Sequence, residues 1–276
     1  MTEKKVKYRK KRPAAKFVMI SLLFVFLATG IYSAFQIIDI MKDYKVGEDE
    51  YNEIARDAVI INPEKNKNNN ESSPNANNET EEEAAFSVDY DALYAINKEY
   101  IGWIYIPDTK INYPMVRAKN NDKYLHRSFK GQYAGCGTIF MDYRNNKDYT
   151  DSHTVIYGHL MKNHTMFYDV RRFEKKDYYD SHRYIYIYVD GGYYVYKTFS
   201  FFQTTATSEV YTFKFDGVDK FNDYCAMLQK KSKFGKDVTL SFDSKVITLS
   251  TCVDASSDKR WVLHAVQTEF VPVPKN

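Results

Sequence analysis

Residues 246–252 read Val-Ile-Thr-Leu-Ser-Thr-Cys and run into a polar loop, Asp254-Ala-Ser-Ser-Asp258. The β-branched and apolar residues predict a strand that ends at Cys252. Strand ends that open into loops are places where reactive side chains are displayed. A cysteine is nevertheless more often a small buried hydrophobe than a nucleophile, so position alone leaves Cys252 undecided between packing and chemistry.

Arg260 strengthens the chemical interpretation of Cys252. An antiparallel hairpin with a seven-residue loop places Arg260 beside Cys252, because adjacent strands lie about 4.8 Å apart. A guanidinium at that range stabilises a thiolate, and it donates hydrogen bonds to the oxyanion formed when the thiolate attacks a carbonyl. The alternative is a surface charge at the end of a hairpin.

A general base for such chemistry has to come from the histidines. The six are His126, His153, His159, His164, His182 and His264. His159 follows the apolar segment Thr154–Tyr157 and Gly158, so it also lies at a predicted strand end. A hydrogen-bonded or exposed imidazole is the commoner role for any one histidine, and spacing alone does not choose His159 over His153.

Residues 86–276 predict one mostly β domain, of a size that supports its own core. Strands are predicted at Ile101–Pro107, Thr138–Met141, Thr154–Tyr157, Tyr184–Val189, Tyr193–Phe199, Val238–Phe242, Val246–Thr251 and Trp261–Thr268. Gly191-Gly192 predicts a hairpin. Helices are predicted at 90–100 and 218–231 from helical spacing of apolar residues. The architecture expected is a largely antiparallel barrel or sandwich with a few helices.

The helix predicted from Val218 to Lys231 has an apolar stripe of Val218, Phe221, Tyr224, Cys225 and Leu228. The 25 tyrosines of the chain could form a sugar-stacking surface. Strands favour aromatic residues in any case, so packing is the commoner explanation for them.

The N-terminus predicts a membrane anchor. Eight Lys and Arg among the first 16 residues precede an uncharged apolar run from Phe17 to Ile38, which is long enough to span a bilayer. A cleavable signal peptide has a shorter apolar core of roughly 7 to 15 residues. We expect a cytoplasmic tail at 1–16 and a single-pass transmembrane signal-anchor helix at 17–40. The basic end stays inside, so the rest of the chain is expected outside the cell.

The net charge of +3 divides unevenly along the chain. The first 16 residues contribute +7, so the remainder is slightly acidic, at about −4. A region without clustered Lys and Arg lacks the electrostatic footprint of nucleic-acid binding. The three cysteines, Cys136, Cys225 and Cys252, are too few and too scattered for a disulfide framework, and an odd number leaves at least one free thiol.

Residues 41–85 are expected to connect the anchor to the domain. Residues 41–61 predict a short juxtamembrane helix whose role the sequence does not reveal. Residues 62–83 form an Asn/Glu-rich tract with Ala76 as the only aliphatic residue. Such a segment cannot bury enough surface to fold, so a flexible, disordered stalk is predicted.

Three motifs resemble those of sortases, in the chain order of that family. Thr248-Leu-Ser-Thr-Cys252 resembles the TLxTC signature, Tyr157-Gly158-His159 the histidine motif and Arg260-Trp-Val the arginine motif. Class B is the most similar branch, on the stretches Ile101–Pro107 with Tyr113-Pro114, Asn121–His126 and Gly137–Asp142, and on the helix before the late strands. The resemblance covers roughly residues 88–270, and the stalk is longer than this class leads us to expect.

The resemblance implies an eight-stranded β-barrel and transpeptidation at the surface of a Gram-positive bacterium. Cys252 would attack the carbonyl after the threonine of a C-terminal sorting signal on a secreted protein, which gives a thioester. A cell-wall peptide amine would then resolve it. His159 would protonate the leaving amine and deprotonate the incoming one, and Arg260 would hold substrate and oxyanion.

Ser250, Thr251 and Asp254 are candidates for substrate-binding or supporting roles. Ser250 shares a strand face with Cys252. Asp254 could orient His159, although we prefer it as a loop residue because the family arginine takes the third catalytic role. No metal-ligand spacing or cofactor fingerprint occurs. Two rival hypotheses remain: a cell-wall cysteine peptidase or amidase that uses water, and a surface adhesion module with an inert Cys252.

Overall fold

A computed structural model describes residues 13–61, 86–241, 243–254 and 256–273. The chain divides into two compact units between Asp43 and Tyr44. The first unit contains the beginning of helix α1 (Pro13–Ala58), which is long and apolar enough to cross a membrane. The expected cytoplasmic tail up to residue 12 and the expected stalk at 62–85 lie outside the described residues.

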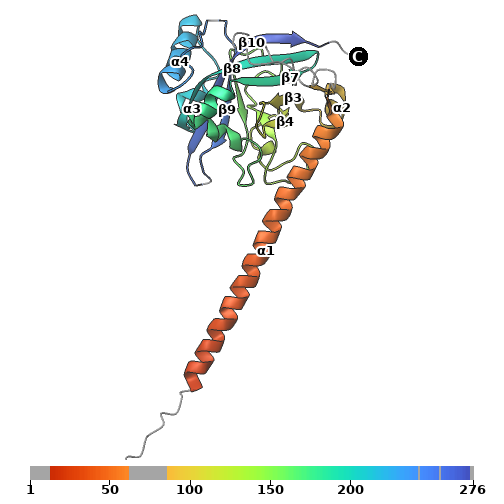
Figure 1. The fold of residues 1–276 in the computed structure, drawn as a ribbon, viewed down its shortest axis with the longest axis vertical. Coiled ribbons are helices and arrows are strands. Elements are labelled where there is room, and N and C mark those ends of the chain that lie inside the picture. Colours follow the sequence, from red (N-terminus) through yellow and green to blue (C-terminus); the bar gives the residue numbers. More distant parts are fainter. Residues whose placement is uncertain (1–12, 62–85, 242, 255, 274–276) are drawn as a thin grey trace, which may run out of the picture. The chain divides into compact units, whose positions relative to one another are not determined.

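The second unit is built on a closed barrel of eight strands, in the order β10-β8-β7-β3-β4-β5-β6-β9 (Figure 1). Its strands are β3 (Tyr100–Tyr105), β4 (Asn112–Val116), β5 (Ile139–Met141), β6 (His153–Tyr157), β7 (Tyr184–Val189), β8 (Gly192–Thr205), β9 (Val246–Cys252) and β10 (Lys259–Pro272). Neighbours are antiparallel except for the β4–β5 and β6–β9 pairs, which are parallel. The expected eight-stranded barrel is confirmed.

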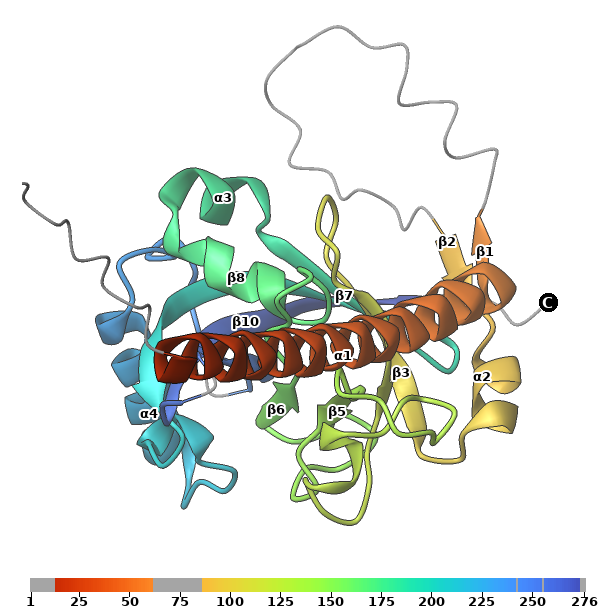
Figure 2. The same ribbon diagram turned by 90° about the horizontal axis from the view of Figure 1, so that it is seen from below.

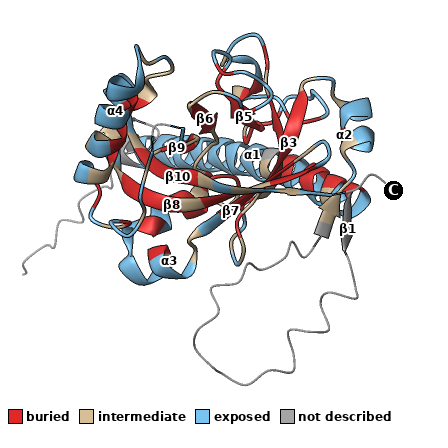
Figure 3. Cartoon of the chain, turned by 90° about the horizontal axis from the view of Figure 1, so that it is seen from above, coloured by how far each residue is buried: buried red, intermediate tan, exposed pale blue. Residues whose placement is uncertain are grey.

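Large side chains are buried at consecutive positions of β3 and β9, on both faces of these strands. Trp103, Ile104, Leu249 and Leu263 are fully buried in one continuous core. Figure 3 shows this burial along the strands, with exposed surfaces on the helices around them. Burying side chains of this size stabilises a fold by about 1.5–3 kcal/mol each, so the strands that carry the predicted site belong to the most stable part of the molecule.

Helices cover the barrel on opposite sides, with α4 (Val218–Lys231) on one and α2 (Tyr90–Ile96) on the other (Figures 1 and 2). Helix α4 has the predicted bounds, and its stripe is buried except at Val218, which is 49% exposed. A further helix, α3 (Lys176–Ser181), and the 3₁₀ turns η2 (Lys123–Leu125), η3 (Tyr168–Glu174) and η4 (Glu209–Tyr211) complete the unit.

Three local predictions were wrong. Helix α2 ends at Ile96 because Asn97 takes an extended backbone conformation, and Tyr100 already belongs to β3. Residues 238–241 form no strand, because β-rich composition does not supply a neighbouring strand to pair with. Strand β4 was missed because it contains Pro114, a residue that argues against a central strand.

The compact unit begins at Tyr44, earlier than the residue 86 expected from the sequence. Tyr51, Ile54 and Ala58 on α1 are buried in the same core cluster as the barrel. After α1 the chain forms β1 (Val59–Ile61), which pairs antiparallel with β2 (Phe86–Val88). Ile61 and Phe86 therefore lie side by side, and residues 44–58 are part of the folded domain.

Candidate active site

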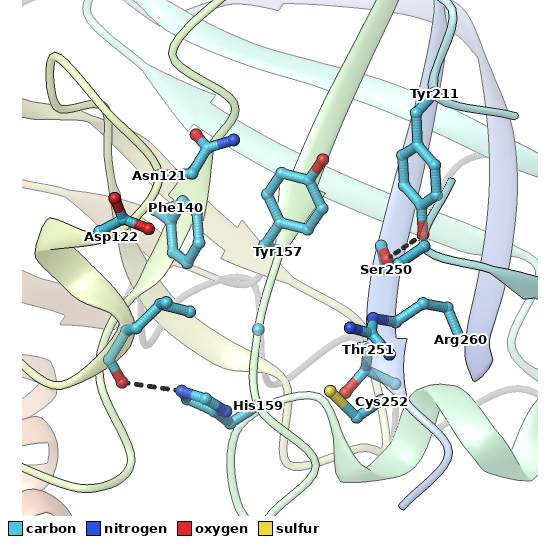
Figure 4. Close-up of a pocket in the computed structure, with 13 residues that line it drawn as sticks. Asn121, Asp122, Phe140, Tyr157, His159, Tyr211, Ser250, Thr251, Cys252 and Arg260 are labelled. Atoms are coloured by element: carbon cyan, nitrogen blue, oxygen red, sulfur yellow. Dashed lines mark hydrogen bonds between the residues drawn. The ribbon is translucent and has the colours of Figure 1, made fainter. Parts of the chain in front are cut away.

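The three predicted catalytic residues line one pocket of about 260 Å³ (Figure 4). The residues that line it are Asn121, Asp122, Leu125, Phe140, Tyr157, Gly158, His159, Ala206, Tyr211, Ser250, Thr251, Cys252 and Arg260. Cys252 comes from the end of β9, His159 from the segment after β6, and Arg260 from the start of β10. These ends meet because β9 pairs with both β6 and β10.

Cys252 differs from the other two cysteines in its surroundings. None of them forms a disulfide, but Cys136 and Cys225 are buried whereas Cys252 is partly exposed. Burial raises the pKa of Cys225 to about 12, which keeps that thiol protonated and inert. Cys252 is thus the thiol that a substrate can reach.

Arg260 lies directly opposite Cys252 in the β9–β10 register, as the loop length predicted. Its Nη1 donates to the carbonyls of Ser257 at 3.3 Å and Lys259 at 3.0 Å. These bonds hold one edge of the guanidinium and leave its other N–H groups for the pocket, where Figure 4 shows it beside Thr251 and Cys252. The arrangement suits an anion that forms at the Cys252 side of the pocket.

His159 is fixed by one ring nitrogen and available at the other. Its Nε2 donates to the Leu125 carbonyl at 2.7 Å. A carbonyl only accepts, so the neutral ring carries its proton on Nε2 and an acceptor lone pair on Nδ1. Figure 4 shows the imidazole between that bond and the Cys252 sulfur. Burial lowers the pKa of His159, the Leu125 bond opposes the shift, and nearby His126 adds to it.

The choice between His159 and His153 is decided by their partners. His153 is fully buried, and its Nδ1 donates to the Thr212 carbonyl while its Nε2 contacts Thr248 Oγ1, both at 2.7 Å. Burial lowers its pKa to about 4. Both nitrogens are occupied, so His153 is a structural residue, and Thr248 of the C-terminal motif serves it as a hydrogen-bond partner.

The supporting candidates separate into pocket and loop residues. Ser250 lies in the pocket wall, and its Oγ is 2.8 Å from the Tyr211 hydroxyl. Thr251 is buried in the same wall, and its Oγ1 has no hydrogen-bond partner among the described residues. Asp254 accepts from the Ser256 N–H and from the hydroxyls of Ser256 and Ser257. It therefore shapes the loop before Arg260 and makes no described contact with His159.

Sequence reasoning missed a buried carboxylate that organises the far wall of the pocket. Asp142 is fully buried and accepts from Asn121 Nδ2 at 2.9 Å and from the Tyr157 hydroxyl at 3.0 Å. Arg144 bonds both carboxylate oxygens, at 2.8 and 2.7 Å. These bonds lower the pKa of Asp142 against the opposing effect of burial. Asn121, Tyr157 and Asp142 lay in stretches that carried the family resemblance, but no spacing rule linked them.

The groups in the pocket support nucleophilic acyl chemistry. They comprise a reachable thiol, an imidazole with one free nitrogen, a guanidinium and a buried hydroxyl. Among the residues that the structure describes, no three His, Cys, Asp or Glu side chains come close enough together to hold a metal ion.

The fold and the pocket agree with the comparisons to known proteins. Residues 104–268 match the sortase domain. A sortase B of Listeria monocytogenes is 36% identical over 161 residues, and the match spans 58% of this chain and 65% of that protein. A sortase B of Staphylococcus aureus is 31% identical over 169 residues, 61% of this chain and 69% of that protein.

Solved structures show the same likeness. Sortase B from Bacillus anthracis in complex with AAEK1 matches with a TM-score of 0.66 and 32% identity, over 83% of this chain and 99% of that one. A Staphylococcus aureus sortase B–substrate complex matches with a TM-score of 0.62 and 31% identity, over 67% and 86%. The chain therefore belongs to the sortase family. Since these relatives are all sortase B proteins, it falls in class B of that family.

Proposed function

We propose that the chain is a membrane-anchored cysteine transpeptidase with Cys252 as nucleophile, His159 as acid and base, and Arg260 as oxyanion and substrate ligand. The observation that carries the proposal is the meeting of these three side chains in one pocket, with Cys252 the reachable thiol. Family membership supports the reaction class.

In the acylation step, His159 Nδ1 takes the Cys252 proton, and the thiolate attacks the carbonyl that follows the threonine of a sorting signal. The negative charge moves to the carbonyl oxygen, where the Arg260 N–H groups stabilise it. The imidazolium then protonates the leaving amine as the C–N bond breaks, which leaves a thioester on Cys252 and a neutral His159.

In the deacylation step, the proton transfers of acylation are repeated with the incoming amine in place of the leaving one. The amine of a cell-wall peptide attacks the thioester carbonyl while His159 Nδ1 takes its proton. Collapse of the oxyanion releases Cys252 as a thiolate, which the imidazolium reprotonates. Because burial lowers its pKa, the ring is neutral at neutral pH and its Nδ1 lone pair is available to take the proton. The Leu125 bond keeps Nδ1, rather than Nε2, as the accepting atom.

Two hydroxyls of the β9 wall support these steps. Thr251 Oγ1 is buried without a described partner, and a buried donor without a partner costs about 1–3 kcal/mol. We infer that a substrate oxygen satisfies it. Ser250 bonds the Tyr211 hydroxyl on the same side of the pocket and acts through that contact.

The anchor completes the proposal. Residues 17–40 of α1 cross the membrane, the basic tail stays in the cytoplasm, and the catalytic domain faces the cell exterior. This topology rests on the apolar helix and the charge distribution around it. It places the pocket where secreted proteins and wall peptides of a Gram-positive cell meet.

The test uses the full-length chain in detergent micelles, a peptide library with one fixed threonine between randomised positions, and triglycine as amine. Mass spectrometry should find acylated Cys252 and peptides joined to triglycine through that threonine, with neither in Cys252→Ala. Hydrolysed peptides alone at every triglycine concentration would indicate the peptidase or amidase. A Cys252 that is neither acylated nor alkylated faster than Cys225 would indicate the adhesion module.

A further inference from the structure

The residues of α1 that belong to the folded domain, Tyr44–Ala58, lie against the segment 124–138. The opposite side of that segment carries the groups that contact His159. The sequence assigned no role to this part of the helix, and the mechanism above does not use it. A short series of contacts nevertheless connects it to the imidazole.

The first contact is made by the Tyr51 hydroxyl. Tyr51 is 6% exposed, and its ring packs edge-to-face on Tyr113 at 5.4 Å. Its hydroxyl donates to the Gly137 carbonyl at 2.6 Å and lies 3.0 Å from Thr138 Oγ1. Burial raises the pKa of Tyr51 well above its usual range, so the hydroxyl keeps its proton and remains a donor.

The second contact joins residues 137–138 to residues 124–127. The Thr138 N–H donates to the Tyr124 carbonyl at 3.1 Å, and its Oγ1 donates to the Arg127 carbonyl at 2.8 Å. Gly137 has φ +59°, and a Cβ there would lie 2.4 Å from the Tyr124 oxygen and 2.7 Å from the Leu125 oxygen. The Leu125 backbone thus packs closely against Gly137, and the Gly137 carbonyl accepts the hydrogen bond from Tyr51.

The third contact reaches the imidazole itself. The Leu125 carbonyl accepts the His159 Nε2 proton at 2.7 Å. The adjacent His126 ring stacks on His159, with centroids 5.8 Å apart and an interplanar angle of 19°. One residue therefore fixes the tautomer of His159, and its neighbour fixes the plane of the ring.

Further contacts define where the helix sits on this segment. Glu50 is buried, and its carboxylate accepts from the Lys130 N–H at 2.9 Å. Glu53 pairs with Lys130 Nζ at 2.8 Å. A Cβ on Gly47 would lie 2.4 Å from Cys136 Sγ, so the helix approaches closely there. These contacts leave the Tyr51 hydroxyl little freedom to move.

We propose that Tyr51 is a positioning residue for His159, which acts through the Gly137 carbonyl and the Leu125–His126 backbone. The inference rests on the role of His159 in the proposed function. In this role Tyr51 keeps the His159 proton on Nε2 and keeps the ring plane fixed. The Nδ1 atom then stays directed at the reacting groups.

The test is Tyr51→Phe in the full-length chain, which removes one oxygen and keeps the ring packing. Thr138→Val provides a second variant in the same series of contacts. Tyr149→Phe is the matched control, because Tyr149 is also buried and its hydroxyl donates to Ile101, outside this segment. Histidine-selective ¹⁵N spectra report which ring nitrogen of His159 carries the proton and how fast that proton exchanges with water.

We expect the Nε2 proton of His159 to exchange roughly fivefold faster in Tyr51→Phe and Thr138→Val, since local opening of the segment becomes easier. Turnover of a peptide selected from the library should fall by about tenfold with KM nearly unchanged, because a misplaced base slows chemistry more than binding. Tyr149→Phe should lower the melting temperature by a comparable amount, but it should change neither the exchange rate of the His159 Nε2 proton nor turnover.

His159 spectra that match the unsubstituted chain in both variants would overturn the inference, whatever happens to stability. The spectra do not depend on catalysis. If His159→Phe left turnover intact, the proposed function would fail, while the coupling between Tyr51 and the ring would still be measured.

Discussion

Two histidines belong to the same strand region and differ in how the fold bonds their ring nitrogens. His153 begins β6, is fully buried, and has both nitrogens bonded within the protein. His159 follows the end of β6, is partly exposed, and is held by Nε2 alone. The fold satisfies one nitrogen of His159 and leaves the other to the pocket, which is what the proposed acid–base role requires. A histidine with two satisfied nitrogens serves stability instead.

Replacing each histidine by phenylalanine should separate the two roles most strongly. His159→Phe is expected to reduce turnover by about 10²–10⁴, the usual contribution of a general acid–base group, with a smaller effect on thermal stability. Peptide ligation measured by mass spectrometry, together with the melting temperature, checks this result. Equal loss of turnover in His153→Phe, in a protein that is still folded at the assay temperature, would contradict the comparison.

Arg260 should show the next largest effect. Arg260→Ala removes the guanidinium opposite Cys252 and is expected to lower kcat/KM by more than tenfold and up to about 10³, as for the loss of an oxyanion ligand. Lys259→Ala is the matched control, because Lys259 is the adjacent exposed cation. Similar activity in the two variants would remove Arg260 from the mechanism.

His153→Phe should mainly affect stability. The substitution leaves the Thr212 carbonyl and the Thr248 hydroxyl without their histidine partner, at about 1–3 kcal/mol for each buried group. Urea unfolding at pH 7.5 should show a decrease of about 2–4 kcal/mol. An unchanged urea midpoint would show that the hydrogen bonds of His153 do not stabilise the start of β6.

The smallest expected effect is a slope of stability with pH. Burial lowers the pKa of His153 to about 4 and that of His264 to about 3. Between pH 6.5 and about 4 the unfolded chain therefore binds more protons than the folded one, and stability falls as the pH falls, by up to about 1.4 kcal/mol per pH unit for each group. Unfolding curves across this range should show a shallower slope in His153→Phe. An identical slope would contradict the assignment.

The parts of the site that could be predicted are those set by local spacing. The position of Arg260 opposite Cys252 followed from the length of one hairpin loop. His159 could be separated from His153 by family resemblance, but the physical distinction depends on Leu125 and Thr248, which lie far from each histidine in sequence. Hydrogen bonds of that kind follow from barrel closure, which no local pattern encodes.

The other features that the sequence did not predict also depend on contacts between segments that are distant in the chain. Asp142 was not predicted as an organising residue because its partners Asn121 and Tyr157 come from separate segments. Residues 44–58 contained buried Tyr51, Ile54 and Ala58, but the polar segment after them suggested that the domain had not yet begun. Only pairing between β1 and β2 shows that the chain returns to the place it left.

The β1–β2 pairing also makes the Asn-rich segment a suitable position for insertion. Ile61 lies opposite Phe86, so the chain leaves the described domain and re-enters it at neighbouring positions. Doubling the length of a flexible loop costs only about 0.6 kcal/mol. An epitope tag inserted between Ile61 and Phe86 is therefore expected to leave the β1–β2 pair and the barrel unaltered, which the melting temperature of the tagged chain would check.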